Sequence, residues 1–146
     1  MQAGCRKRKI QAGEEPTVAS GGGGVPVRYD EQGRLTGVEA VVNKSHTATL
    51  IADEVQADTI VFVSQAEKIR QAFPQAVNGL TRFTLTELTK HIEQRKDELT
   101  DSMYLKLLAS CKYLTAPGKS IWIITPEQLE TALNQDLGIQ LISDPE

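Results

Sequence analysis

Four consecutive glycines at residues 21–24 constrain this chain more than any other feature of its sequence. Glycine has no Cβ, so such a tract adopts positive φ readily and lets the backbone approach a ligand closely. Glycine tracts also serve as flexible linkers, which are usually surrounded by polar sequence of low complexity. Here the apolar residues 17–19 precede the tract and Val25-Pro26-Val27 follows it, and these flanks favour a contact loop over a linker.

The composition predicts one acidic globular domain. Hydrophobic residues make up 40% of the 146 positions, which is enough for a single domain with a real core. The formal net charge is −3, but residues 6–9 are all basic, so the rest of the chain carries 12 basic and 19 acidic residues. An acidic body lacks the basic surface that binds nucleic acid, so no nucleic-acid partner is expected.

Cysteine content and hydropathy exclude further classes of protein. Cys5 and Cys111 are too few for a disulfide framework and have no metal-ligand spacing around them, so no metal centre is expected. No apolar run approaches the roughly 18 residues of a membrane span, and no signal-peptide pattern follows the basic N-terminus. The sequence therefore predicts a cytoplasmic protein without membrane association.

The first 16 residues differ from the remainder of the chain. Residues 1–16 show no hydrophobic periodicity and end in Gly13-Glu14-Glu15-Pro16, so we expect a flexible basic tail. The basic cluster fits nucleic-acid or localisation roles, but its brevity favours a solvated tail. Residues 17–146 are expected to form one domain.

Hydrophobic patterning in this domain predicts strands that alternate with helices. Ala48, Leu50, Ile51 and Val55 recur at helical spacing, which predicts a helix that begins near Ser45. The expected strands are 17–19, 25–29, 35–42, 59–63, 120–124 and 139–142, with 25–29 and 35–42 forming a β-hairpin. The expected helices are 45–55, 67–72, 85–96 after a Thr84–Glu87 capping box, 102–114, and one from Thr125-Pro126 to near Gly138.

This order indicates an α/β fold, a three-layer sandwich with a mainly parallel sheet and right-handed crossovers. Ligands of open α/β sheets bind beyond the carboxyl ends of the strands. Here those ends are the glycine tract, residues 64–67 and Thr125, where we expect the ligand site.

Four side chains receive structural interpretations. His46 and His91 have no carboxylate or serine pattern around them, so each is expected to be an ordinary surface or helix-face histidine. Trp122 lies within an apolar run and is expected in the core. Cys111 lies on the apolar stripe of its helix and is expected to be a small buried hydrophobe.

Four segments together resemble the C-terminal half of carbamate kinases, in the amino-acid kinase superfamily. They are residues 20–27, 37–44, 57–63 and 102–106, and their order and spacing agree with that family over residues 17–142. The resemblance implies the C-terminal half of the amino-acid kinase fold, with a β-hairpin after the glycine loop. In the family, the complete enzyme has a further N-terminal half and transfers a phosphoryl group between ADP or ATP and carbamate or carbamoyl phosphate, with Mg²⁺.

The resemblance also implies which residues contact the nucleotide. Lys44 and Lys106 match the positions of catalytic lysines. The residues that match nucleotide-binding positions are Gly21, Gly22, Gly23, Gly24, Ser64, Met103 and Lys106. With Asp101 at the N-cap, Lys106 is expected in the first turn of its helix, where backbone amides favour phosphate.

Three positions depart from the family pattern. Ser45 replaces the aspartate that orients the lysines, Gln65 replaces a possible acid, and Asp101 replaces a glycine beside the phosphates. Phosphoryl transfer depends on positioned cations, so lysines without their anchoring carboxylate lose orientation, while Asp101 repels phosphate. We therefore expect weakened or absent binding of ATP or ADP, and impaired or no activity of this chain alone.

The missing N-terminal half leaves two alternatives to a nucleotide-binding domain. A sheet edge that this half would adjoin is expected to be exposed, and a second copy of the chain or another chain should cover it. The chain would then be a homo-oligomer or a non-catalytic interaction module, similar to a pseudokinase subunit. The other alternative is a truncated remnant of a longer reading frame.

Overall fold

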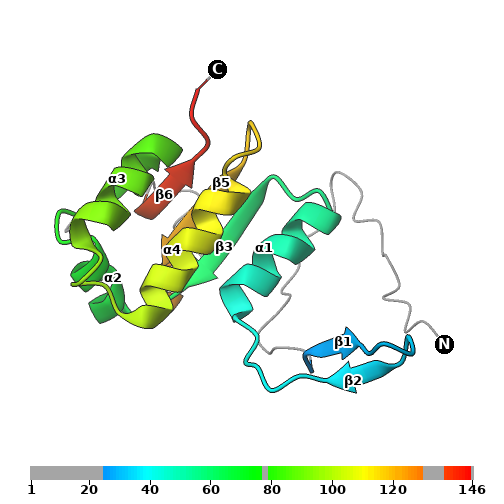
Figure 1. Ribbon diagram of the computed structural model, residues 1–146. Coiled ribbons are helices and arrows are strands. Elements are labelled where there is room, and N and C mark those ends of the chain that lie inside the picture. The colour runs from blue at the N-terminus through cyan, green and yellow to red at the C-terminus, as the bar shows by residue number, and fades with distance from the viewer. Residues whose placement is uncertain (1–24, 77–78, 130–136, 146) are drawn as a thin grey trace. The chain divides into compact units, whose positions relative to one another are not determined.

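The computed structural model describes residues 25–76, 79–129 and 137–145 (Figure 1). The chain divides into two compact units, Met1–Ala57 and Asp58–Glu146. The predicted tail, the predicted strand at 17–19, and Gly21, Gly22, Gly23 and Gly24 lie outside the described residues, as does most of the helix predicted after Pro126.

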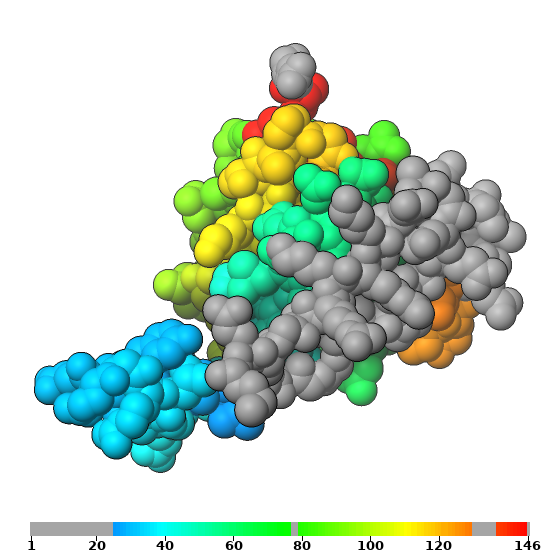
Figure 2. All heavy atoms as spheres, turned by 90° about the vertical axis from the view of Figure 1, so that its right-hand side faces the viewer, coloured from blue at the N-terminus to red at the C-terminus, as the bar shows by residue number. Residues whose placement is uncertain are grey.

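The first unit contains the predicted β-hairpin. Strand β1, Val27–Tyr29, pairs antiparallel with strand β2, Leu35–Gly37, which is shorter than predicted. The Asp30 carboxylate stabilises the turn, because it accepts hydrogen bonds from the backbone amides of Gln32 and Arg34 and from the Arg34 guanidinium. Every residue of both strands is exposed, and Figure 2 draws the hairpin in blue to cyan.

Helix α1, Lys44–Glu54, follows the hairpin and starts one residue earlier than predicted. Its N-cap is Asn43, whose side chain accepts from the amide of His46 at 3.0 Å. The buried stripe consists of Ser45, Thr49 and Ala52, whereas Leu50 is 52% exposed. The predicted apolar stripe is therefore wrong, and the Thr49 hydroxyl tolerates burial because it donates to the carbonyl of His46.

The second unit is built on a four-stranded sheet in the order β3-β5-β6-β4. The strands are β3 (Thr59–Val63), β4 (Leu80–Thr84), β5 (Ser120–Ile124) and β6 (Gly138–Ile142). Strand β3 is parallel to β5 and β4 is parallel to β6, whereas β5 and β6 are antiparallel neighbours. The sheet is therefore mostly parallel, and the predicted α/β class is confirmed.

Strand β4 was not predicted, because its sequence hides the strand pattern. Thr81 and Arg82 interrupt the apolar Leu80 and Phe83, so the segment shows neither a continuous apolar run nor clear alternation. Its register against β6 supplies what the pattern lacks, including a hydrogen bond from Arg82 Nε to Gln140 Oε1 of 2.8 Å. Tertiary pairing decides the conformation here.

Helices flank this sheet, and α3 (Leu85–Arg95) and α4 (Asp101–Tyr113) lie side by side across it (Figure 1). The predicted capping box starts α3, since Thr84 accepts from the amide of Glu87 and Glu87 accepts from the amide of Thr84. Helix α4 is capped by Thr100, not by Asp101. Lys106 therefore lies in the second turn of α4, so its predicted place in the first turn is wrong.

The remaining helical elements are short. Helix α2, Ala66–Ala72, connects β3 with the loop before β4, close to the predicted range. The 3-10 turn η1, Pro126–Gln128, begins after Thr125 as the Thr-Pro signal predicts.

The core of the second unit forms between the sheet and α3 and α4. Its most buried side chains are Leu88, Met103, Leu107, Tyr113, Leu114, Ile121, Ile123, Ile139 and Leu141. Trp122 is buried as predicted, in a separate cluster with Ile124 and Leu80. Among the described residues, no helix is long and apolar enough to cross a membrane.

Candidate functional site

The carboxyl ends of β3 and β5 lie together, because these two strands are parallel neighbours. They form one edge of the sheet, which here means a side along which strands begin or end. Ser64 directly follows β3, and its amide donates to the carbonyl of Ile124 at 2.8 Å, which continues the ladder by one residue. Thr125 directly follows β5. Two of the three strand ends at which the ligand site was predicted therefore lie together.

Lys106 places a cation at this edge. Its Nζ donates to Ser64 Oγ at 3.2 Å and lies 5.3 Å from the centroid of the Phe62 ring. The lysine is half-buried on α4, and Phe62 is on the face of β3 from which Ser64 also points. An ammonium and a hydroxyl at the end of a parallel strand form a suitable pair for a phosphate oxygen.

The start of β6 completes the backbone of this edge. Gly138 has φ +99°, and a Cβ at this position would lie 2.9 Å from Ile124 Cγ2 and 3.1 Å from the Ile123 carbonyl oxygen. A side chain therefore does not fit, and glycine permits β6 to approach the end of β5.

Two other residues predicted for the site, Met103 and Lys44, are described separately from this pair. Met103 is only 2% exposed, and its amide bonds to Thr100, so it contributes to the core and to the cap of α4. Lys44 is the exposed first residue of α1 and belongs to the first unit, whereas Ser64 and Lys106 belong to the second. The structure thus brings together Ser64 and Lys106 of the predicted set.

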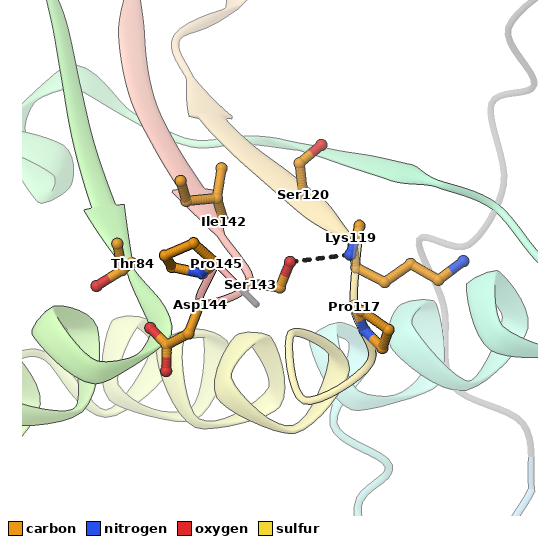
Figure 3. A pocket seen from close by; sticks show the side chains of 9 residues that line it. Thr84, Pro117, Lys119, Ser120, Ile142, Ser143, Asp144 and Pro145 are labelled. Carbon is orange, nitrogen blue, oxygen red and sulfur yellow. Dashed lines mark hydrogen bonds between the residues drawn. The ribbon is translucent and has the colours of Figure 1, made fainter.

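A cavity of about 500 Å³ lies at the opposite edge of the sheet, where β4 and β6 end and β5 begins (Figure 3). It is lined by Thr84, residues 117–120 and residues 142–145. Ser143 Oγ accepts from the amide of Gly118 at 3.0 Å. The side chain of Lys119 extends away from Ser143 in Figure 3 and pairs with Asp58 at 3.6 Å.

Asp144, at the same cavity, serves the start of α3. Its carboxylate accepts from the amide of Thr86 at 3.0 Å and from the Thr86 hydroxyl at 2.8 Å. The bond from the Thr86 amide is the main reason that the pKa of Asp144 lies below its usual value. This carboxylate therefore supports the helix.

Two further sequence-based interpretations need correction. His91 lies on a face of α3, one of the two predicted alternatives, but it is only 8% exposed and packs in an aromatic cluster, so the surface alternative is wrong. Cys111 is only half-buried and lines a cavity of about 340 Å³ between α3 and α4. Burial raises the pKa of its thiol, which keeps the thiolate scarce. His46 is exposed, in agreement with its prediction.

Known proteins with similar sequences agree on one family. No family model matches the chain. The chain is 33% identical over 144 residues to the carbamate kinase-like protein YahI of Escherichia coli (strain K12), a match that covers 97% of this chain and 45% of YahI. It is 31% identical over 142 residues to the carbamate kinase of Pyrococcus horikoshii, with 97% and 44% covered. This chain is homologous to the carbamate kinases.

Solved structures with a similar fold include carbamate kinases. A crystal structure from Aeropyrum pernix K1 matches with a TM-score of 0.66 and 26% identity, over 83% of this chain and 39% of that one. The carbamate kinase of Giardia lamblia bound to AMP-PNP matches with a TM-score of 0.67 and 22% identity, over 84% and 42%. The chain therefore has the expected fold, and it spans less than half the length of these relatives.

Proposed function

We propose that this chain is a nucleotide-binding domain of the carbamate kinase type, in which Ser64 and Lys106 contact a phosphate of ATP or ADP. The bond between Lys106 Nζ and Ser64 Oγ at the carboxyl end of β3 carries this proposal. Homology to carbamate kinases supports it, as does the AMP-PNP bound to the Giardia lamblia enzyme of the same fold. The reaction of the family, phosphoryl transfer between ADP or ATP and carbamoyl phosphate or carbamate, is the one in which the domain would take part.

We further propose that the chain binds nucleotide with little or no turnover of its own. Ser45 is buried beside Lys44 at the start of α1, where the family resemblance calls for the aspartate that orients the lysine. Lys44 would thus lack its anchoring carboxylate, and transfer depends on positioned charge. An exposed Asp101 in the first turn of α4 would add repulsion toward phosphate.

Mg²⁺ would arrive with the nucleotide in this proposal. In the described part of the chain, no group of three or more His, Cys, Asp or Glu side chains is arranged to hold a metal ion. Mg²⁺ commonly keeps several waters and binds through substrate phosphates with one or two carboxylates. In this proposal, the phosphates and water would supply most ligands of the Mg²⁺.

Calorimetric titration of the full chain with Mg-ADP and Mg-ATP tests the proposal. We expect saturable binding, and a loss of affinity of about tenfold or more for Lys106→Met, because a charge-assisted bond to phosphate disappears. Lys112→Met is the matched control, since Lys112 is exposed in the last turn of the same helix. Absence of binding at millimolar nucleotide, or equal affinities for both variants, contradicts the proposal.

A second function, that of a non-catalytic interaction module, is favoured by β3, an outer strand of the described sheet. This edge strand contains no charged residue or proline, and Val61 and Val63 are 36% and 48% exposed. Such an edge is a template for another strand, from a second copy or a different chain. Light scattering coupled to size exclusion tests it: a stable dimer without nucleotide affinity supports this function, and a monomer up to high concentration contradicts self-association.

A further inference from the structure

The last turn of α2 is bonded by two side chains of α3. The final carbonyl groups of a helix have no partner within that helix. His91 Nε2 lies 2.8 Å from the carbonyl oxygen of Ala72, and Arg95 Nη2 donates to that of Gln71 at 3.1 Å. His91 and Arg95 are four residues apart, so they project from the same face of α3. Together they cap the C-terminus of α2.

Further bonds fix this contact from the other side. Gln71 Nε2 donates to the carbonyl of Glu98 at 3.0 Å, and Arg95 Nη2 pairs with Glu98 Oε2 at 2.7 Å. The buried Arg95 Nε has no hydrogen-bond partner in the described structure, so the Nη2 bonds determine where the guanidinium lies. Directional hydrogen bonds therefore fix the position of α2 relative to α3 and Glu98.

The His91 ring has a defined orientation within the core. It stacks on Phe73 with a centroid distance of 4.9 Å and an interplanar angle of 5°, and it is tilted against Phe83 at 5.2 Å. A carbonyl oxygen only accepts hydrogen bonds, so Nε2 must carry the hydrogen. The stack would be equally possible with phenylalanine, whereas the bond to Ala72 requires a donor.

The other end of α2 leads directly to the candidate site. Ala66, its first residue, follows Ser64 after one intervening residue, and α2 has only seven residues. Ser64 contacts Lys106 through its hydroxyl and Ile124 through its amide. We propose that His91 and Arg95 are positioning residues, which hold α2 and thereby fix where Ser64 presents its hydroxyl to the phosphate. The part that concerns phosphate rests on the proposed function.

Two variants of the full chain distinguish the hydrogen bonds of His91 and Arg95 to α2 from general packing. His91→Phe keeps an aromatic ring and removes the donor to Ala72, and Arg95→Met keeps most of the aliphatic stem and removes the donor to Gln71. His91→Gln and Arg95→Lys are the conservative variants, because each retains a donor. Lys90→Met, at an exposed position of the same helix, is the matched control.

Hydrogen exchange without nucleotide gives the first measurement. We expect amides of residues 64–73 to exchange about tenfold faster in both donor-free variants, with β5 amides unchanged and partial rescue in the conservative ones. Unchanged exchange in residues 64–73 overturns the proposal. So does an equal increase across β5, because that result indicates general destabilisation.

Titration with Mg-ADP gives the second measurement. We expect each donor-free variant to bind about five- to tenfold more weakly than the unaltered chain, and Lys90→Met to bind equally well. Binding by the unaltered chain with no loss in the variants overturns the link to phosphate. If the unaltered chain does not bind, the proposed nucleotide function fails. Hydrogen exchange alone then decides whether His91 and Arg95 hold α2 and Ser64 in position.

Discussion

The two edges of the sheet in the second unit use their charged groups differently, although each is the carboxyl edge of a parallel strand pair. Where β3 and β5 end, the Lys106 ammonium contacts the Ser64 hydroxyl and the ring of Phe62. Where β4 and β6 end, the Asp144 carboxylate accepts two hydrogen bonds from Thr86. Strands of five residues separate the two edges by roughly 16 Å.

In the proposed function, the phosphate site and the larger cavity lie at opposite edges of the sheet. The edge near Asp144 has a cavity of about 500 Å³, but its carboxylate and the Ser143 hydroxyl stabilise local backbone. The edge near Ser64 has a cation held by a hydroxyl at a strand end, which is the chemistry that a phosphate needs. The following predictions test this assignment.

The largest expected effect is a difference in stability loss between alanine variants of two glycines, one at each edge. Gly138→Ala should destabilise the fold by about 2–3 kcal/mol, because positive φ is strained and the new Cβ would meet Ile124 and the Ile123 carbonyl. Gly118→Ala should cost about 1 kcal/mol, since its φ is also positive but no atom lies within 4 Å of the new Cβ. Urea unfolding measures both, and equal losses would contradict the close approach at Gly138.

Replacing the serine at each edge should give smaller effects, on nucleotide binding at one edge and on stability at the other. Ser64→Ala should weaken Mg-ADP binding about three- to tenfold with little change in stability, because one hydroxyl contact is lost. Ser143→Ala should leave binding unchanged and reduce stability by about 1 kcal/mol, because the amide of Gly118 loses its acceptor. Calorimetry and urea unfolding distinguish the two, and the reverse pattern would move the site to the other edge.

The smallest expected effect concerns the pH dependence of stability. The pKa of Asp144 lies below its usual 3.8 in the folded chain, chiefly through the Thr86 amide, so this carboxylate stabilises the fold above pH 3.8. That contribution is lost as the pH falls through the lowered pKa. Asp144→Asn should therefore lower the urea midpoint at pH 7, and the difference from the unaltered chain should shrink toward pH 3. Asp97→Asn, at an exposed aspartate, serves as the control, and an undiminished difference at pH 3 would be the contrary result.

Local signals in the sequence predict much of this fold. The capping box at Thr84 and Glu87, the hairpin turn at Asp30, and the apolar runs of β3 and β5 each determine structure through nearby residues. Long-range pairing explains the failures. Strand β4 becomes recognisable only beside β6, and the antiparallel junction of β5 and β6 decides which strand ends share an edge.

The candidate site was only partly accessible from sequence, for the same reason. Family resemblance singled out Ser64 and Lys106, which lie 42 residues apart and meet only in the folded chain. The burial of His91 depends on the carbonyl of Ala72, 19 residues away, and leaves no periodic signal. Met103 matched a family position, but it lies one turn from Leu107 on the buried face of α4 and is part of the core.

The antiparallel junction of β5 and β6 has a practical consequence for experiments. Ile142, the last residue of β6, is paired with Ser120, the first residue of β5, so the chain leaves the sheet at the far side from Ser64. A fluorescent dye or a surface tether attached just after β6 would therefore be at the other end of the strands from Ser64 and Lys106. Immobilisation by this route suits measurements in which nucleotide flows over the captured protein.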